Sequence, residues 1–266
     1  MNTNKIIIAG GTGFLGECLA TYFSEKGFKT VILSRKEKKS VGNVSFAKWD
    51  GEALGDWQKE LEGSSTVINL SGKSVDCRYT EKNKKEIIDS RVKSTLLIGK
   101  AIQSCTTPPK LWMNASSATI YRHSENKPMD EPSGEIGDGF SVEVCKAWEK
   151  ALTQMETPDT RKVALRLSMV LSKRSGVMAP IMNLVRFGLG GAMAGGKQYI
   201  SWIHETDFVR MIEWIMQHED LAGPVNICSP NPITNAEFMR ALRKEMKMPL
   251  GIPQACLLYT SDAADE

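Results

Sequence analysis

Three glycines near the start of the chain have the spacing of a phosphate-binding loop. The segment KIIIAGGTGFLG places Gly10, Gly13 and Gly16 directly after an apolar run and at the start of an amphipathic stretch. In a strand-turn-helix segment the first glycine permits a tight turn, the second lets backbone N–H groups approach a pyrophosphate, and the third lets helix and strand pack closely. The pattern predicts a dinucleotide-binding loop, and the alternative is a glycine-rich turn that serves packing alone.

The end of the second apolar run selects the form of the dinucleotide. An NAD site normally has Asp or Glu there to hold the ribose hydroxyls, but this chain has Ser34 and Arg35, followed by Lys36. A carboxylate would repel a 2′-phosphate, whereas a hydroxyl and a guanidinium can bind it. NADP(H) is therefore the expected cofactor. If Arg35 and Lys36 only form a solvated loop, the preference stays open.

The elements that position these residues follow a simple alternation. Short β-branched runs are separated by amphipathic stretches at 14–26, 53–61, 80–104 and 141–156, which are typical of helices. The runs expected to be strands are 5–10, 29–34, 43–49, 66–71, 110–117 and 161–168. This order predicts an α/β fold with a doubly wound parallel sheet of the Rossmann type.

The remainder of the chain has a different rhythm, with glycine and proline punctuating mixed strand and helix patterns. We expect a Rossmann domain that binds NADP(H) over residues 1–175. A small substrate-binding lobe over residues 176–255 should lie at the carboxyl edge of the sheet.

Composition excludes several classes of function. The net charge is only +3, and the lysine-rich runs at 35–39 and 81–86 are typical of solvated faces, so no nucleic-acid partner is expected. No apolar run approaches the roughly 20 residues of a membrane span, and the N-terminus has no signal-peptide pattern. The six cysteines show no metal-ligand spacing. These features predict a cytoplasmic protein with free thiols, no metal site and no membrane partner.

The last residues differ in character from the rest. The tail CLLYTSDAADE, residues 256–266, resembles the in-frame translation of a transposon-type sequencing adapter, and a genuine C-terminal turn is the alternative. Under the first interpretation, the natural sequence is known only through about residue 255.

Four segments in order, GGTGFLG, NLSG at 69–72, SSATIY at 116–121 and WIHETD at 202–207, carry a family resemblance. The chain resembles the extended short-chain dehydrogenase/reductases, the NAD(P)-dependent epimerase/dehydratase group, from residue 5 to about 255. More narrowly, FGLGGAMAGGKQYISWIH and SPNPITNAEF resemble an uncharacterised "epimerase family" oxidoreductase branch. That branch normally has a further C-terminal segment, so the resemblance implies a C-terminally truncated chain.

The resemblance implies roles for individual residues. Phe14 and Leu15 should lie against the pyrophosphate with the glycines. Ser117 matches the serine or threonine whose hydroxyl holds the reacting oxygen. The segment expected to line the adenosine and ribose side of the cofactor comprises Leu70, Ser71 and Gly72.

The chain departs from the group at its Tyr-x-x-x-Lys pair. Alignment on Glu149 places Ser141 at the tyrosine position and Cys145 at the lysine position. A serine hydroxyl is too weak an acid to replace tyrosine, and a neutral thiol supplies no cation. Tyr121 is the leading candidate for another proton donor, followed by Cys145 and His123. The alternatives are a cleft-wall role for Tyr121 and a packing role for Cys145.

Two arginines, Arg78 and Arg91, could bind an anionic substrate or the cofactor, although surface ion pairs would equally explain them. The sequence thus predicts an NADP(H)-dependent oxidoreductase or epimerase-like enzyme that acts on a small molecule. The alternative is a non-catalytic protein that binds NADP(H) and responds to redox state. Substrate identity and oligomeric state are not determined by these patterns.

Overall fold

The structure is a computed structural model that describes residues 4–36, 38–173 and 176–253. The tail at 256–266, interpreted above as adapter sequence, lies outside these residues. No helix within the described ranges is long and apolar enough to cross a membrane.

Seven parallel strands form one central sheet in the order β10-β6-β5-β4-β1-β2-β3. The winding reverses between β1 and β4, which confirms the expected doubly wound α/β fold and creates a crevice at the carboxyl ends of these two strands. The strands are β1 Lys5–Ala9, β2 Lys29–Ser34, β3 Val44–Lys48, β4 Thr66–Asn69, β5 Leu111–Ser117, β6 Arg161–Leu167 and β10 Gly223–Ile227.

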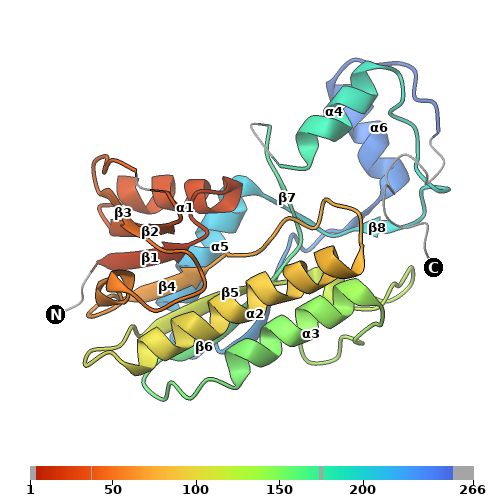
Figure 1. Ribbon diagram of the computed structural model, residues 1–266. Coiled ribbons are helices and arrows are strands. Elements are labelled where there is room, and N and C mark those ends of the chain that lie inside the picture. The colour runs from red at the N-terminus through yellow and green to blue at the C-terminus, as the bar shows by residue number, and fades with distance from the viewer. Residues whose placement is uncertain (1–3, 37, 174–175, 254–266) are drawn as a thin grey trace.

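Both faces of the sheet are covered, and the side chains of β1 alternate between two cores. Ile6 and Ile8 pack into the core that also holds side chains of α1 and α5, whereas Ile7 and Ala9 pack into the core beneath α2 and α3. Figure 1 shows α2 and α3 side by side along one face of the sheet. The helices are α1 Phe14–Glu25, α2 Glu81–Gln103, α3 Phe140–Thr153 and α5 Glu205–Gln217.

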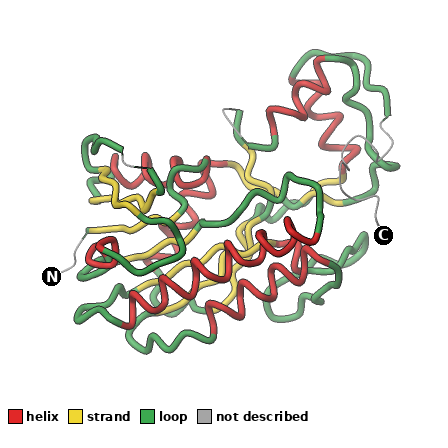
Figure 2. The backbone as a smooth tube through the Cα atoms, viewed as in Figure 1, coloured by secondary structure: helices red, strands yellow, loops and turns green. Residues whose placement is uncertain are grey.

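A smaller lobe projects beyond the carboxyl edge of the sheet (Figure 1). Helices α4 Met178–Arg186 and α6 Asn235–Glu245 pack through a separate apolar cluster. Strand β8, Tyr199–Ile200, pairs antiparallel with β11, Ile233–Thr234. In Figure 2 the strands gather in the body of the molecule, and the lobe is mostly helix and loop.

The chain passes between the body and the lobe more than once after residue 175. Strand β7, Met169–Leu171, pairs with β9, Trp202–His204, and α5 then returns to the main core. Strand β10 pairs with β6 at the edge of the central sheet. Two elements of the range 176–255 therefore pack with the Rossmann sheet.

The helix expected at 53–61 is wrong in type. This segment forms only a short 3-10 helix, η1, over Asp56–Glu60. Gln58 donates its N–H to the Gly55 carbonyl and Leu61 donates to Gln58, so the turns close after three residues. Burial of the Trp57 indole anchors this single turn to the core in place of a longer amphipathic helix.

Candidate functional site

The glycine loop joins β1 to α1 at the crevice. Gly10 adopts a φ of +74°, and a Cβ there would lie 2.8 Å from the Leu70 carbonyl carbon. A Cβ on Gly16 would lie 2.3 Å from the Cα of Gly11, so helix α1 approaches the loop too closely for any side chain. Gly13 is different, because its nearest neighbour would be 3.6 Å away.

The amino end of α1 is open. Gly13 is the N-cap residue, and it offers no side chain to accept a hydrogen bond from the first turn. Phe14 and Leu15 begin the helix and are half-buried against the core. The first N–H groups of the helix and its dipole thus provide positive electrostatic potential beside the glycine loop.

Ser34 and Arg35 lie at the carboxyl end of β2, next to β1 in the sheet. The Ser34 hydroxyl accepts a hydrogen bond from the Lys36 N–H at 3.2 Å and shapes the turn. Arg35 is exposed and has no ion-pair partner within the described ranges. A cation and a hydroxyl therefore occur where an acidic residue would repel a phosphate.

The end of β4 supplies a polar group without a partner. The Leu70 N–H donates to the Ala9 carbonyl at 2.9 Å, and the Ser71 N–H donates to Asn69 Oδ1 at 3.0 Å. The Ser71 hydroxyl is buried and has no hydrogen-bond partner in the part of the chain that the structure describes. Such a group is costly unless a ligand satisfies it, so this position fits a cofactor hydroxyl.

A buried polar cluster lies behind this segment. Asn69 donates to Asn114 Oδ1 at 2.7 Å, the Thr95 hydroxyl donates to the same oxygen at 3.1 Å, and the Trp148 indole N–H donates to Thr95 Oγ1 at 3.1 Å. The cluster ties β4, β5, α2 and α3 together. Sequence reasoning missed it, although Asn69 and Asn114 each interrupt an otherwise apolar run.

Ser117 and Cys145 are brought together through a third residue. The Thr119 N–H and hydroxyl donate to Ser117 Oγ at 3.2 and 3.0 Å, and Thr119 Oγ1 lies 3.6 Å from the Cys145 Sγ. Burial raises the pKa of the Cys145 thiol, which keeps it neutral. Within the described ranges, the Ser117 O–H has no acceptor of its own. Sequence reasoning did not single out Thr119.

Tyr121 belongs to a different hydrogen-bond network. Arg166 Nη1 donates to the Tyr121 hydroxyl at 2.7 Å, and that hydroxyl donates to Asn226 Oδ1 at 2.9 Å. Arg166 is otherwise held by Glu149 through two hydrogen bonds of 2.9 Å, and Ser116 donates to the same carboxylate at 2.7 Å. The hydrogen bond with Glu149 raises the pKa of Arg166, so its charge is fixed.

Sequence reasoning also missed Arg166 and Glu149 as a pair. Arg166 lies between Leu165 and Leu167 in the buried inner part of β6, beyond the basic residues at the start of the strand, and a charge at that buried place was the available signal. A cation in a strand buried on both faces needs a partner.

A cavity of about 650 Å³ opens where β6 and β10 meet the lobe. Tyr121, Arg166, Asn226 and Cys228 line its inner side, and Tyr199 of the lobe lines another part. The Tyr121 network therefore faces a space large enough for a small molecule. His123 lies on the same wall and is exposed.

The two candidate arginines have different environments. Arg78 is exposed in the loop before α2. Arg91 is half-buried, its guanidinium carbon lies 5.0 Å from the centre of the Trp148 ring, and Cys145 is nearby. Only Arg91 of the two thus lies against α3 beside the Ser117 group.

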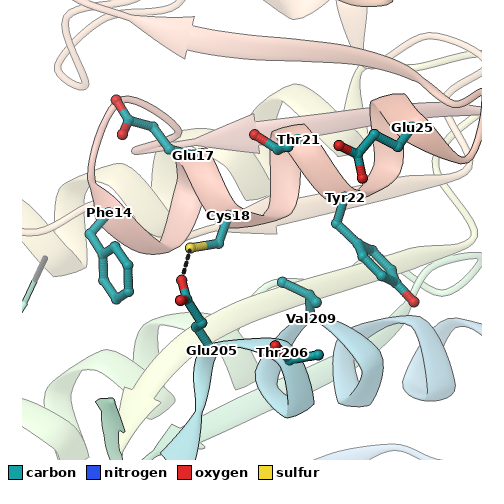
Figure 3. Close-up of a pocket in the computed structure, with 9 residues that line it drawn as sticks. All are labelled: Phe14, Glu17, Cys18, Thr21, Tyr22, Glu25, Glu205, Thr206 and Val209. Atoms are coloured by element: carbon teal, nitrogen blue, oxygen red, sulfur yellow. Dashed lines mark hydrogen bonds between the residues drawn. The ribbon is translucent and has the colours of Figure 1, made fainter. Parts of the chain in front are cut away.

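A second cavity, of about 640 Å³, lies between α1 and α5 (Figure 3). The Cys18 thiol donates to Glu205 Oε2 at 3.5 Å across it, and Phe14 lies at one end. Phe14 is the only predicted site residue that lines this cavity. Within the described ranges, no cluster of three His, Cys, Asp or Glu side chains could hold a metal.

Comparisons with known proteins place the chain in a family. The model of the NAD dependent epimerase/dehydratase family matches residues 6–228. Epimerase family protein YfhF of Bacillus subtilis is 32% identical over 251 residues, which cover 94% of this chain and 82% of that protein. The human epimerase family protein SDR39U1 is 32% identical over 243 residues, covering 90% of this chain and 79% of that protein.

A solved structure gives the same result. The crystal structure of human SDR39U1 (isoform 2) with NADPH superposes with a TM-score of 0.83 at 26% identity, covering 96% of this chain and 84% of that one. The match to the family model and the fold agree with the expected resemblance. The chain belongs to the NAD dependent epimerase/dehydratase family.

Proposed function

We propose that this protein is an NADP(H)-dependent oxidoreductase or epimerase-like enzyme that acts on a small molecule at the carboxyl edge of the sheet. The observation that carries the proposal is the Ser117 hydroxyl. It accepts two hydrogen bonds from Thr119, and its own proton has no acceptor within the described ranges. A hydroxyl held in this way is ready to donate to the oxygen of a carbonyl or alcohol.

The residues of the crevice fit an NADP(H) cofactor. The glycine loop and the first turn of α1, which no N-cap side chain covers, would hold the pyrophosphate through backbone N–H groups. Ser34 and Arg35 would hold the 2′-phosphate, and Leu70, Ser71 and Gly72 would line the adenosine and ribose side. When bound, the nicotinamide accepts or donates a hydride. The NADPH in the human relative's structure supports this choice.

Ser117 would orient the reacting oxygen, and Tyr121 would supply the proton. Arg166, 2.7 Å from the Tyr121 hydroxyl, would stabilise the negative charge left on that oxygen. Cys145 would act through Thr119, since its neutral thiol can donate to the Thr119 hydroxyl that in turn donates to Ser117. In this scheme Cys145 positions Ser117 and Tyr121 transfers the proton.

A second candidate function rests on a specific observation. The Tyr121 proton is donated to Asn226, and no hydrogen bond links Tyr121 to Ser117 within the described ranges. That arrangement also suits a protein that binds NADP(H) and responds to redox state without turnover.

Substrate-dependent oxidation of NADPH across panels of sugars, quinones and carbonyl compounds tests the proposal. Ser117→Ala and Tyr121→Phe should each lower kcat by at least about 100-fold, as the loss of a group acting on the reacting oxygen does. Ser141→Ala, an exposed serine of α3, is the control and should keep full activity.

Tight NADPH binding without turnover on any panel would favour the second candidate. Activity that survives Tyr121→Phe but is lost in Cys145→Ala would instead assign proton transfer to the Cys145–Thr119–Ser117 chain.

A further inference from the structure

Arg91 is a half-buried cation with unused hydrogen-bonding capacity. A guanidinium has five N–H donors. Arg91 uses only its Nη1 group, which donates to the Lys73 and Ile87 carbonyls at 3.0 Å each. Its Nε and Nη2 groups have no hydrogen-bond partner within the described ranges.

Arg91 also lacks a counter-charge. Arg166 is paired with Glu149, and Arg122 is paired with Glu135, but no carboxylate lies within ion-pair distance of Arg91 in the part of the chain that the structure describes. Burial lowers the pKa of Arg91 and outweighs the opposite effect of the nearby Cys145 and Tyr79. The charged form is therefore held in a partly desolvated place at a cost that no protein anion offsets.

The guanidinium of Arg91 lies close to the Trp148 ring and to the segment that follows β4. Its guanidinium carbon lies 5.0 Å above the Trp148 ring, which holds it flat against α3 one turn after Cys145. On the other side, a Cβ on Gly72 would lie 3.0 Å from the same carbon. Gly72, in the segment that follows β4, therefore packs closely against the guanidinium and leaves no room for a side chain at this position.

An oxyanion would accept hydrogen bonds from the unpaired N–H groups of Arg91 and balance its charge. Two parallel N–H donors of a guanidinium match a carboxylate in bidentate geometry. We propose that Arg91 recognises a carboxylate of the substrate, so that the substrate class is a carboxylate-bearing small molecule. This inference rests on the proposed function, because it places the carboxylate in the same cleft as the cofactor and Ser117.

Arg91 has a structural alternative, in which it only ties the Lys73 segment to α2 through its two carbonyl contacts. A further alternative is that a phosphate of the cofactor accepts hydrogen bonds from the unpaired N–H groups of Arg91. The two alternatives predict different effects of substituting Arg91.

The test is calorimetric titration of the NADPH-saturated protein with benzoate and with its neutral counterpart benzamide, together with inorganic phosphate. Wild-type protein should bind benzoate more tightly than benzamide or phosphate. Arg91→Gln should weaken benzoate binding at least tenfold, the scale of a lost charged hydrogen bond, and leave benzamide unchanged. Arg91→Lys should be intermediate, and Arg210→Gln, an exposed change on α5, is the matched control with no effect.

NADPH titration of every variant separates the possible failures. If wild-type protein binds no NADPH, the proposed function fails first. If NADPH affinity is intact and benzoate is not preferred over benzamide, the carboxylate proposal is overturned. A loss of NADPH affinity in Arg91→Gln would assign the cation to the cofactor. A lower thermal midpoint with unchanged benzoate affinity would show a structural role only, and both results contradict the proposal.

Discussion

The ion pair between Glu149 and Arg166 should make a large contribution to stability when only one partner is removed. Their side chains are 17% and 8% exposed, and two hydrogen bonds of 2.9 Å join them. Glu149→Ala removes both bonds and the one from Ser116, and it leaves a buried guanidinium without a counter-charge. Breaking a buried pair in this way costs about 3–5 kcal/mol. The residual exposure of Glu149 lets water replace part of the lost interaction. We therefore expect Glu149→Ala to lower the free energy of unfolding by about 3 kcal/mol.

Urea denaturation followed by circular dichroism measures this cost as a change in the free energy of unfolding. Lys150→Ala, an exposed change on the same helix, is the control and should cost less than about 0.5 kcal/mol. The double variant Glu149→Leu with Arg166→Met should recover most of the loss, because an apolar pair of similar volume needs no counter-charge. A loss below about 1 kcal/mol for Glu149→Ala would show that water or other groups replace the counter-charge of Arg166.

Three further predictions concern single positions. Gly16→Ala should destabilise the fold, because its Cβ would lie 2.3 Å from the Cα of Gly11. Gly13→Ala should fold normally and weaken NADPH binding, because the nearest atom to its Cβ would be 3.6 Å away. Equal thermal midpoints for the two variants would contradict this prediction. Cys145 should react with iodoacetamide much more slowly than a free thiol at pH 8, because burial raises its pKa; rapid labelling by mass spectrometry would show otherwise. Hydrogen bonds from two neighbouring cations hold the pKa of Glu135 at about 2, below its ordinary 4.5, so its contribution to stability is complete above pH 4.5 and is lost as the pH falls toward 2. A carboxyl midpoint above pH 4 in an NMR titration would contradict that assignment.

Much of the fold could be predicted because its signals are local. The apolar runs of a parallel sheet buried on both faces are continuous, and the glycine loop requires an adjacent strand and helix. The six expected strands all occur in the central sheet. The seventh strand, β10, could not be assigned to it, because it begins with Gly223 and Pro224 in the part of the chain that glycine and proline punctuate.

The candidate site could be predicted only in part. The glycine loop is specified by sequence spacing. The position of Ser34 and Arg35 directly after the second apolar run can also be read from the sequence. The network of Tyr121, Arg166 and Asn226 depends on three segments that only the fold brings together. Contacts between segments that are distant in the sequence cannot be predicted from sequence spacing. The charge of Arg166 within a buried strand was the only sequence signal for this network.

We propose that the crevice binds NADP(H) and selects it over NAD(H) through Arg35. The most direct measurement is parallel titration of the protein with NADPH and NADH by nicotinamide fluorescence, with Arg35→Ala and the exposed control Lys39→Ala. We expect at least tenfold tighter binding of NADPH than of NADH, a preference lost in Arg35→Ala and kept in Lys39→Ala. Equal affinity for the two dinucleotides, or an NADPH preference that survives Arg35→Ala, would contradict it.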